Sequence, residues 1–171
     1  TWSWAVLPTW RGTVFAEATH PPVWWVVTRL WIEAFGDSEA ALRAPAALVS
    51  VLSMGLAWLL AVRLLDPAHQ PIRGGFPRTP DDGRGRTAAV WATGIFALSS
   101  YLVEYAQEAR MYAALLLETL ALCLLYLRWL DRQDRLSLSL YALVGALALY
   151  THYFGVWPIV AHAAHALWLG A

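Results

Sequence analysis

The sequence predicts an all-α protein, a polytopic transmembrane helical bundle with one juxtamembrane helix in the membrane interface. Of its 171 residues, 59% are hydrophobic and only 14% are charged, which is too apolar for an ordinary soluble domain of this size. Several apolar runs are long enough for helices that cross a bilayer, and short polar connections separate them. The formal net charge is zero, which argues against a nucleic-acid partner.

The first 36 residues are expected to form an extracytoplasmic loop followed by the juxtamembrane helix. Residues 1–19 mix Trp and Phe with Pro, Arg and Gly, a pattern typical of the lipid headgroup layer. Pro21 and Pro22 then open a helix over Val23–Phe35 that stops at Gly36. Roughly 14 residues reach about 21 Å, short of a hydrocarbon core of about 30 Å. We therefore expect this helix to lie along the membrane surface.

Residues 37–171 are expected to form the transmembrane bundle, with about five spans. Asp37 or Ser38 can cap the first span, whose apolar body is Ala44–Leu65, and Pro45 should bend it near its start. Asp66–Arg86 is rich in Pro, Gly and Arg and has no hydrophobic periodicity, which indicates a flexible connection. The later spans are expected over Thr87–Glu104, Met111–Trp129, Leu136–Tyr150 and Phe154–Ala171.

Arginine sets the expected orientation. All twelve basic residues are Arg, and eight of them lie between Arg63 and Arg86 or between Arg128 and Arg135. The positive-inside rule places these two connections in the cytoplasm. Alternation of the spans then puts the other polar clusters on the extracytoplasmic face. Because Arg without Lys and many Ala suggest a GC-rich bacterial genome, we expect a bacterial inner (plasma) membrane protein with an extracytoplasmic active site.

A charged interruption, Tyr105-Ala106-Gln107-Glu108-Ala109-Arg110-Met111-Tyr112, lies between two apolar runs. Its guanidinium, carboxylate and two phenols indicate a site for an anionic ligand at the membrane surface. Arg43 and Arg110 are candidate phosphate-binding residues, because the planar fork of Arg donates two charge-assisted hydrogen bonds to phosphate oxygens. Each could instead reach bulk lipid phosphate or pair with a nearby Glu. Tyr112 can donate a hydroxyl to the phosphate or belong to the aromatic belt.

Further polar residues are candidates for the substrate cleft on the same face. Gln107 and Glu108 lie within the charged interruption, where Glu108 could orient Arg110, bind acceptor hydroxyls or neutralise Arg110 locally. His152 and Tyr153 lie at the next connection on this side and either line the cleft or serve a structural role at a helix break. These alternatives are not separable by spacing alone.

Five other ionisable residues have more than one interpretation. Glu17 and His20 form a carboxylate–imidazole pair that could bind sugar, contact phosphate or hold a metal, although His20 could equally cap the helix that follows. Glu118 lies roughly 10 Å inside its span and is expected to be a hydrogen-bonded glutamic acid within the bundle. His162 and His165 have a spacing that a metal site could use, but with no third ligand nearby we predict no metal site there.

Four motifs carry a family resemblance. In order they are Glu17-Ala18-Thr19-His20-Pro21-Pro22, Phe35-Gly36-Asp37-Ser38-Glu39 with Leu42-Arg43-Ala44-Pro45, Tyr105 to Tyr112 as quoted above, and Tyr150-Thr151-His152-Tyr153-Phe154. Together they resemble the membrane glycosyltransferases of the GT-C superfamily, in the protein O-mannosyltransferase and aminoarabinose-transferase-like branch. The resemblance covers nearly the whole chain. It implies an enzyme that takes a sugar from a polyprenyl-phosphate donor and passes it to a lipid, glycan or protein acceptor; a divalent metal is left open.

The resemblance also implies a catalytic base. In that family an Asp, usually followed by Glu, stands just after the first membrane helix, whereas this sequence begins with Thr1 and has no Asp before Asp37. We therefore expect an N-terminally truncated fragment whose main base lies upstream of Thr1, with Glu17 as the candidate catalytic residue within the chain. The alternative functions are a membrane transporter or flippase, in which Glu118 would line the pathway, and a non-catalytic membrane scaffold.

Overall fold

A computed structural model describes residues 21–66 and 83–170, and every regular element in these two ranges is helical. The prediction of an all-α protein is confirmed. In chain order the elements are α3 (Val23–Phe35), α4 (Glu39–Leu65), α5 (Arg84–Ala97), α6 (Ser100–Gln107), α7 (Tyr112–Arg132), α8 (Arg135–Thr151), the 3-10 turn η2 (Tyr153–Gly155) and α9 (Val156–Leu169).

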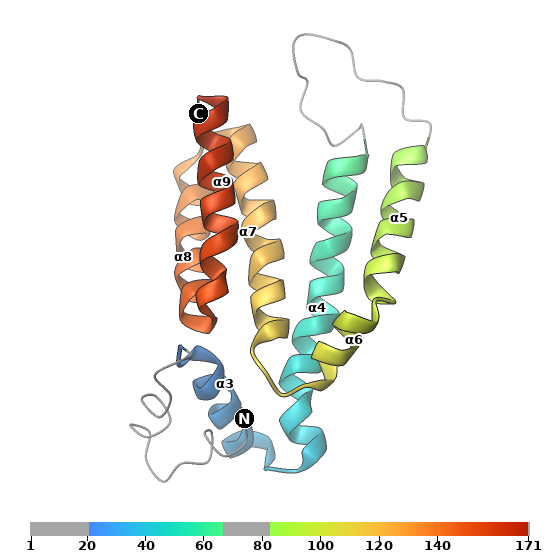
Figure 1. Ribbon diagram of the computed structural model, residues 1–171, viewed down its shortest axis with the longest axis vertical. Helices are drawn as coiled ribbons and strands as arrows, with labels where there is room; N and C mark the ends of the chain where they lie inside the picture. The colour runs from blue at the N-terminus through green and yellow to red at the C-terminus, as the bar shows by residue number, and fades with distance from the viewer. Residues whose placement is uncertain (1–20, 67–82, 171) are drawn as a thin grey trace.

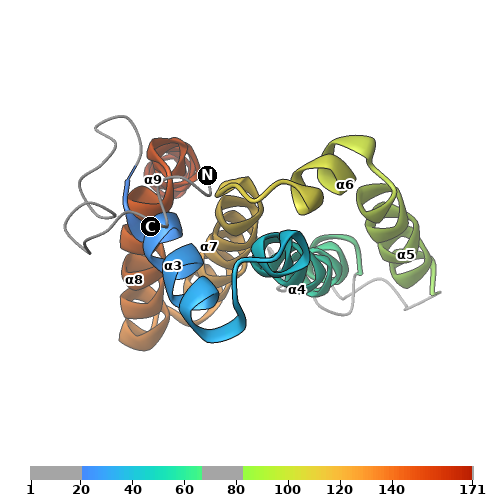
Figure 2. The ribbon, with the colours of Figure 1, turned by 90° about the horizontal axis from the view of Figure 1, so that it is seen from below.

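The longer helices of the bundle run roughly side by side in two groups (Figure 1). Helices α7, α8 and α9 form one group, and α4 with α5 forms the other. Helix α4 joins them, because it packs against both α5 and α7. The short helices α3 and α6 lie at the same end of the bundle, and the view from below shows α3 crossing that end beside α8 (Figure 2).

Helix α3 has the bounds that the sequence predicts. It begins after Pro22 and ends at Gly36, whose φ of 84° is a conformation that a residue with a side chain rarely adopts. Trp24 and Trp25 are buried and pack in a cluster with Ala46, Met111 and Ala113. The indole Nε1 of Trp24 donates a hydrogen bond to the Ala109 carbonyl at 3.3 Å. These contacts fix α3 across the end of the bundle.

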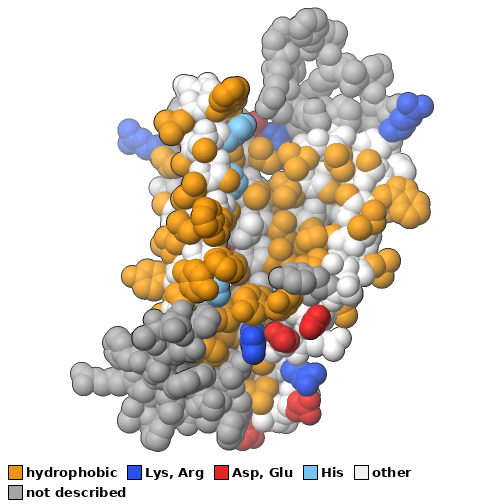
Figure 3. All heavy atoms as spheres, viewed as in Figure 1, with side chains coloured by type: hydrophobic (Ala, Val, Ile, Leu, Met, Phe, Trp, Pro, Cys, Tyr) orange, Lys and Arg blue, Asp and Glu red, His pale blue; other side chains and the backbone are white. Residues whose placement is uncertain are grey.

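Helices α4 and α7 are the two helices, among the described residues, that are long and apolar enough to cross a membrane. Ser38 caps α4 by accepting a hydrogen bond from the Ala41 N–H at 3.2 Å, and Pro45 lies inside the helix. Only 11% of the apolar window of α4 and 22% of that of α7 is buried, unlike a core helix of a soluble protein. Hydrophobic side chains cover the middle of the visible face, while charged side chains lie toward its ends (Figure 3).

The prediction of one continuous helix over Thr87–Glu104 is wrong. Helix α5 ends at Ala97, and α6 starts at Ser100 after Ser99, whose backbone is extended (φ −61°, ψ 120°). Figure 1 shows α6 turning away from the axis of α5. Helix α6 packs against α4 and α7, so the break brings its polar C-terminal end next to the start of α7.

The described ends of the two Arg-rich connections lie at the end of the bundle opposite α3 (Figure 1). Arg63 at the end of α4 pairs with Asp131 near the end of α7. Arg86 in the first turn of α5 donates from Nε to the fully buried Asp66 carboxylate at 3.3 Å. Within residues 21–66 and 83–170 the long helices alternate in direction, as the sequence predicts (Figure 1). Helices α3 and α6 lie at the other end of the bundle, where Arg43 lines one space with residues 107–110.

Asp134 caps α8 at the Arg-rich end of the bundle. We expect this cap to make a pH-dependent contribution to stability. Its carboxylate accepts hydrogen bonds from the Ser137 backbone N–H at 2.7 Å and the Ser137 hydroxyl at 2.8 Å. These bonds, together with nearby Arg128 and Arg132, lower the pKa of Asp134. The lowered pKa means that the cap stabilises the fold above the unfolded pKa of about 3.9, and that this stabilisation is lost as pH falls through the lower folded pKa.

Asp134→Asn keeps a capping side chain but removes the ionisable group. We expect the thermal unfolding midpoint of the unaltered protein to fall more steeply than that of Asp134→Asn as the pH drops below about 4. Unfolding followed by circular dichroism in detergent across this range measures the difference. Identical pH profiles for the two proteins would contradict the role given to this carboxylate.

Candidate functional site

A polar cavity of about 280 Å³ lies at the α3 end of the bundle. Helix α4 contributes Glu39, Leu42 and Arg43, and residues 107–110 contribute the opposite wall. The cavity exists because α6 ends over α4, which brings two segments more than 60 residues apart in the sequence to the same place. The predicted convergence of Arg43, Gln107, Glu108 and Arg110 is therefore seen in the structure.

Each guanidinium in the polar cavity has an acidic partner. Arg43 Nη2 lies 2.6 Å from Glu39 Oε1, and Arg110 Nε lies 3.8 Å from Glu108 Oε2. Local pairing with Glu, one of the alternatives for both Arg residues, is thus present. These pairs are exposed, and such pairs contribute only about 0–1 kcal/mol to stability. An Arg side chain also carries five N–H donors, so a single carboxylate leaves donors for another anion.

Glu108 differs from Glu39 in one respect. Its Oε2 atom is buried, and among the described residues it accepts no hydrogen bond. A buried carboxylate oxygen without a hydrogen-bond donor is unfavourable by about 1–3 kcal/mol. Arg110 Nε, at 3.8 Å, is too far from this oxygen for a hydrogen bond, so the contact between Glu108 and Arg110 is an ion pair only.

A larger apolar groove of about 640 Å³ adjoins the polar cavity. It lies between α4, α6, α7 and the last residues of α5, and Gln107 lines both the groove and the polar cavity. Tyr112 also lines the groove, and its ring packs edge-on against Tyr105 with centroids 4.8 Å apart. The groove wall is otherwise mainly aliphatic, including Val51, Met54, Leu102, Val103, Leu115 and Leu116.

His152 and Tyr153 line neither the polar cavity nor the groove. His152 is only 1% exposed, and its Nδ1 accepts a hydrogen bond from the Phe154 N–H at 3.1 Å. Its ring lies 5.7 Å from that of Tyr112 and 4.3 Å from that of the exposed Tyr153. His152 is therefore buried at the helix break, with its ring beside that of Tyr112. Phe154, which the site prediction did not include, is the residue of this motif that reaches the groove.

Glu118 is the buried, hydrogen-bonded carboxyl group that the sequence predicts. Its side chain is 7% exposed, and Oε1 accepts a hydrogen bond from the Thr151 hydroxyl at 2.8 Å. Glu118 lies between α7 and α8, whereas its neighbour Thr119 faces the groove. It therefore does not line the groove, which is the place that a transport pathway along this face would require.

The remaining candidate residues lie away from the polar cavity or outside the described residues. His162 and His165 are hydrogen-bonded to Tyr141 and Tyr126, and the searched part of the chain contains no group of three or more side chains placed to hold a metal ion. Glu17 and His20 fall within residues 1–20, outside the described ranges.

The chain matches no protein-family model, no curated protein and no solved structure. The site must therefore be interpreted from its own geometry and from the sequence motifs.

Proposed function

We propose that this chain is a polytopic membrane glycosyltransferase that uses a polyprenyl-phosphate-linked sugar as its donor. The observation that carries the proposal is the meeting of the polar cavity and the apolar groove at Gln107. A polyprenyl phosphate has a charged phosphate at one end and a long apolar tail, and the two spaces match these parts in order. The ordered motifs that resemble the GT-C superfamily support the same donor.

The donor phosphate would occupy the polar cavity between Arg43 and Arg110. Their side chains line one space, and both lie on segments that end at the same face of the bundle. Binding of the phosphate replaces the weak exposed pairs with Glu39 and Glu108 by charge-assisted hydrogen bonds. Tyr112 lines the groove at the first residue of α7, and its hydroxyl would donate a hydrogen bond to a phosphate oxygen beside Gln107.

The isoprenoid tail would follow the groove along α4 toward the middle of the bundle. The groove runs past Val51 and Met54, which lie two to three helical turns after Arg43 along α4. If α4 and α7 cross the bilayer, the groove lies at the depth of the lipid hydrocarbon and the polar cavity at the headgroups. The positive-inside rule then places the polar cavity on the extracytoplasmic face, in a bacterial inner membrane.

The proposed reaction is a direct displacement at the anomeric carbon of the sugar. An acceptor hydroxyl oxygen forms the new bond to this carbon, while the bond from the carbon to the phosphate oxygen breaks. Polyprenyl phosphate leaves with the electron pair, and Arg43 and Arg110 stabilise the negative charge that develops on it. The acceptor proton passes to a carboxylate base, for which the family resemblance implies an acidic residue before the described part of the chain, and the configuration inverts.

A transporter or flippase is the main alternative from another class. Its key residue would be Glu118, yet this carboxyl faces α8 and is hydrogen-bonded to Thr151 instead of facing the groove. A non-catalytic scaffold would require neither a paired-arginine cavity nor an adjoining groove. The geometry thus supports donor binding best.

Binding of the lipid alone tests this proposal. The chain in detergent micelles should bind a polyprenyl phosphate saturably, and it should bind the polyprenol of the same length at least tenfold more weakly, because charge-assisted hydrogen bonds contribute about 1.5–3 kcal/mol. Phosphatidic acid serves as the control for general attraction to anionic lipid. Equal affinity for the phosphate and the alcohol, or for polyprenyl phosphate and phosphatidic acid, would contradict the proposal.

A further inference from the structure

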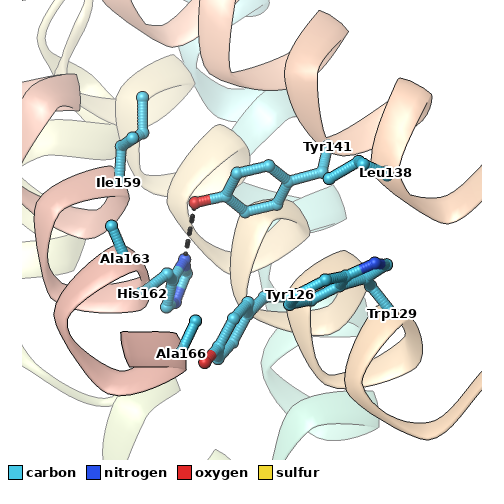
Figure 4. Close-up of a pocket in the computed structure, with 8 residues that line it drawn as sticks. All are labelled: Tyr126, Trp129, Leu138, Tyr141, Ile159, His162, Ala163 and Ala166. Carbon is cyan, nitrogen blue, oxygen red and sulfur yellow. Dashed lines mark hydrogen bonds between the residues drawn. The ribbon is translucent and has the colours of Figure 1, made fainter. Parts of the chain in front are cut away.

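A second cavity lies near the opposite end of the bundle, between α7, α8 and α9 (Figure 4). Its volume is about 140 Å³. Four rings form much of its wall, those of Tyr126, Trp129, Tyr141 and His162. Aliphatic side chains form the rest: Leu138, Ile159, Ala163 and Ala166. None of these residues has a part in the proposed sugar transfer. We call this space the ring cavity.

The two tyrosine hydroxyls of the ring cavity are hydrogen-bonded to histidines of α9. The Tyr141 hydroxyl lies 3.0 Å from His162 Nδ1, and the Tyr126 hydroxyl lies 2.7 Å from Nδ1 of the neighbouring His165. The rings of Tyr126 and His162 are stacked, with centroids 4.4 Å apart and planes only 10° from parallel. These contacts hold the rings in position without a ligand. They also leave ring faces and edges as the surface that a ligand would meet.

Tyr126 and Tyr141, on two sides of the ring cavity, lie at the same distance from the Arg-rich end of the bundle. Tyr126 is six residues before the end of α7, and Tyr141 is six residues after the start of α8. At a rise of about 1.5 Å per residue, both lie roughly 9 Å from that end. Ala163, which also lines the cavity, is exposed, so the cavity opens to the surroundings of α9. In a bilayer this opening would face hydrocarbon.

We propose that the ring cavity binds one neutral aromatic ring of a membrane-dissolved molecule. Its volume is close to that of a protein cavity of about 150 Å³ known to bind benzene. Aromatic rings attract one another in offset or edge-to-face arrangements with centroids about 4.5–7 Å apart, and the four ring side chains provide such partners. A neutral ligand is required, because the lining contains no Arg, Asp or Glu. Flat, fixed walls favour a rigid planar ring over an acyl chain, which would lose rotational freedom.

Fluorobenzene is a suitable probe, with fluorine NMR of the chain in detergent micelles as the readout. We expect a saturable component above the linear partition of the probe into micelles. Ala166→Leu, which fills the cavity, should weaken this component at least tenfold. Ala164→Leu adds the same side chain at an exposed position of α9 that does not line the cavity, and it should leave the affinity unchanged.

A second variant tests the aromatic wall without filling the space. Trp129→Leu should weaken fluorobenzene binding by roughly 2- to 12-fold, the range that corresponds to one aromatic pair. If Ala166→Leu does not fold, Trp129→Leu alone tests whether the ring cavity binds the probe. Thermal unfolding of each variant shows whether it is folded. Cyclohexane should compete at least threefold less well than benzene. Equal competition by cyclohexane, displacement of the probe by n-decane, or no saturable component in the unaltered chain would overturn the proposal.

Discussion

Arg110→Lys should weaken binding of polyprenyl phosphate by roughly tenfold or more. The lysine keeps the positive charge, but a single ammonium group cannot reproduce the two parallel hydrogen bonds that a guanidinium makes to a phosphate. Losing a charge-assisted hydrogen bond is expected to reduce binding by about 1.5–3 kcal/mol. Titration of the purified variant with polyprenyl phosphate, in the assay described above, measures the effect directly.

Arg135→Lys is the matched control, because Arg135 is an exposed arginine at the opposite end of the bundle. This change should leave donor affinity unaltered. Arg43→Lys should resemble Arg110→Lys, and the double variant should lose less than the sum of the two if both guanidinium groups contact one phosphate. A folded Arg110→Lys protein with unchanged affinity would show that Arg110 contacts only bulk lipid.

Gly155→Ala should destabilise the packing of α9 on α8 by about 1–3 kcal/mol, the usual effect of inserting a methyl group into a filled space. A Cβ at Gly155 would lie 2.7 Å from the carbonyl carbon and 2.8 Å from the carbonyl oxygen of Ala148. These are backbone atoms of α8, which cannot turn aside as the end of a side chain can. The thermal unfolding midpoint of the variant should therefore be lower than that of the unaltered chain.

Gly94→Ala provides the comparison for Gly155→Ala. Gly94 lies inside α5, and a Cβ there would have no heavy atom within 4 Å. Replacing a glycine inside a helix with alanine is expected to stabilise it by roughly 0.5–1 kcal/mol. Equal unfolding midpoints for the two alanine variants would show that the close approach of Gly155 to Ala148 is not retained in solution.

Local signals in the sequence predicted the bounds of α3 and, to within one residue, those of α8. Pro22 and Gly36 frame α3, and Ser38 caps α4, because each residue has a backbone or side-chain preference that acts within a few neighbours. The break between α5 and α6 could not be predicted in this way. The segment around Leu98 and Ser99 contains no Pro or Gly, and its interruption accompanies the packing of α6 against α4 and α7.

For the candidate site, too, the sequence predicted some features, whereas others depend on how the helices pack. The shared face of Arg43 and Arg110 followed from counting alternating spans, and the structure brings both to one cavity. The groove and the burial of His152 did not follow, because they depend on how α4, α6, α7 and α8 pack. Nothing in the spacing of Thr151-His152-Tyr153-Phe154 indicates that the histidine turns inward while Phe154 reaches the groove.

The break after α5 also bears on how a lipid substrate would reach the site. Phe96 and Ala97 at the end of α5 line the groove together with residues of α4, α6 and α7. In the proposed membrane placement the groove lies at the depth of the lipid hydrocarbon, and a long-chain substrate would enter it sideways from the leaflet without crossing water. Capture would then be a two-dimensional search, governed by the mole fraction of the lipid in the membrane and not by its concentration in solution.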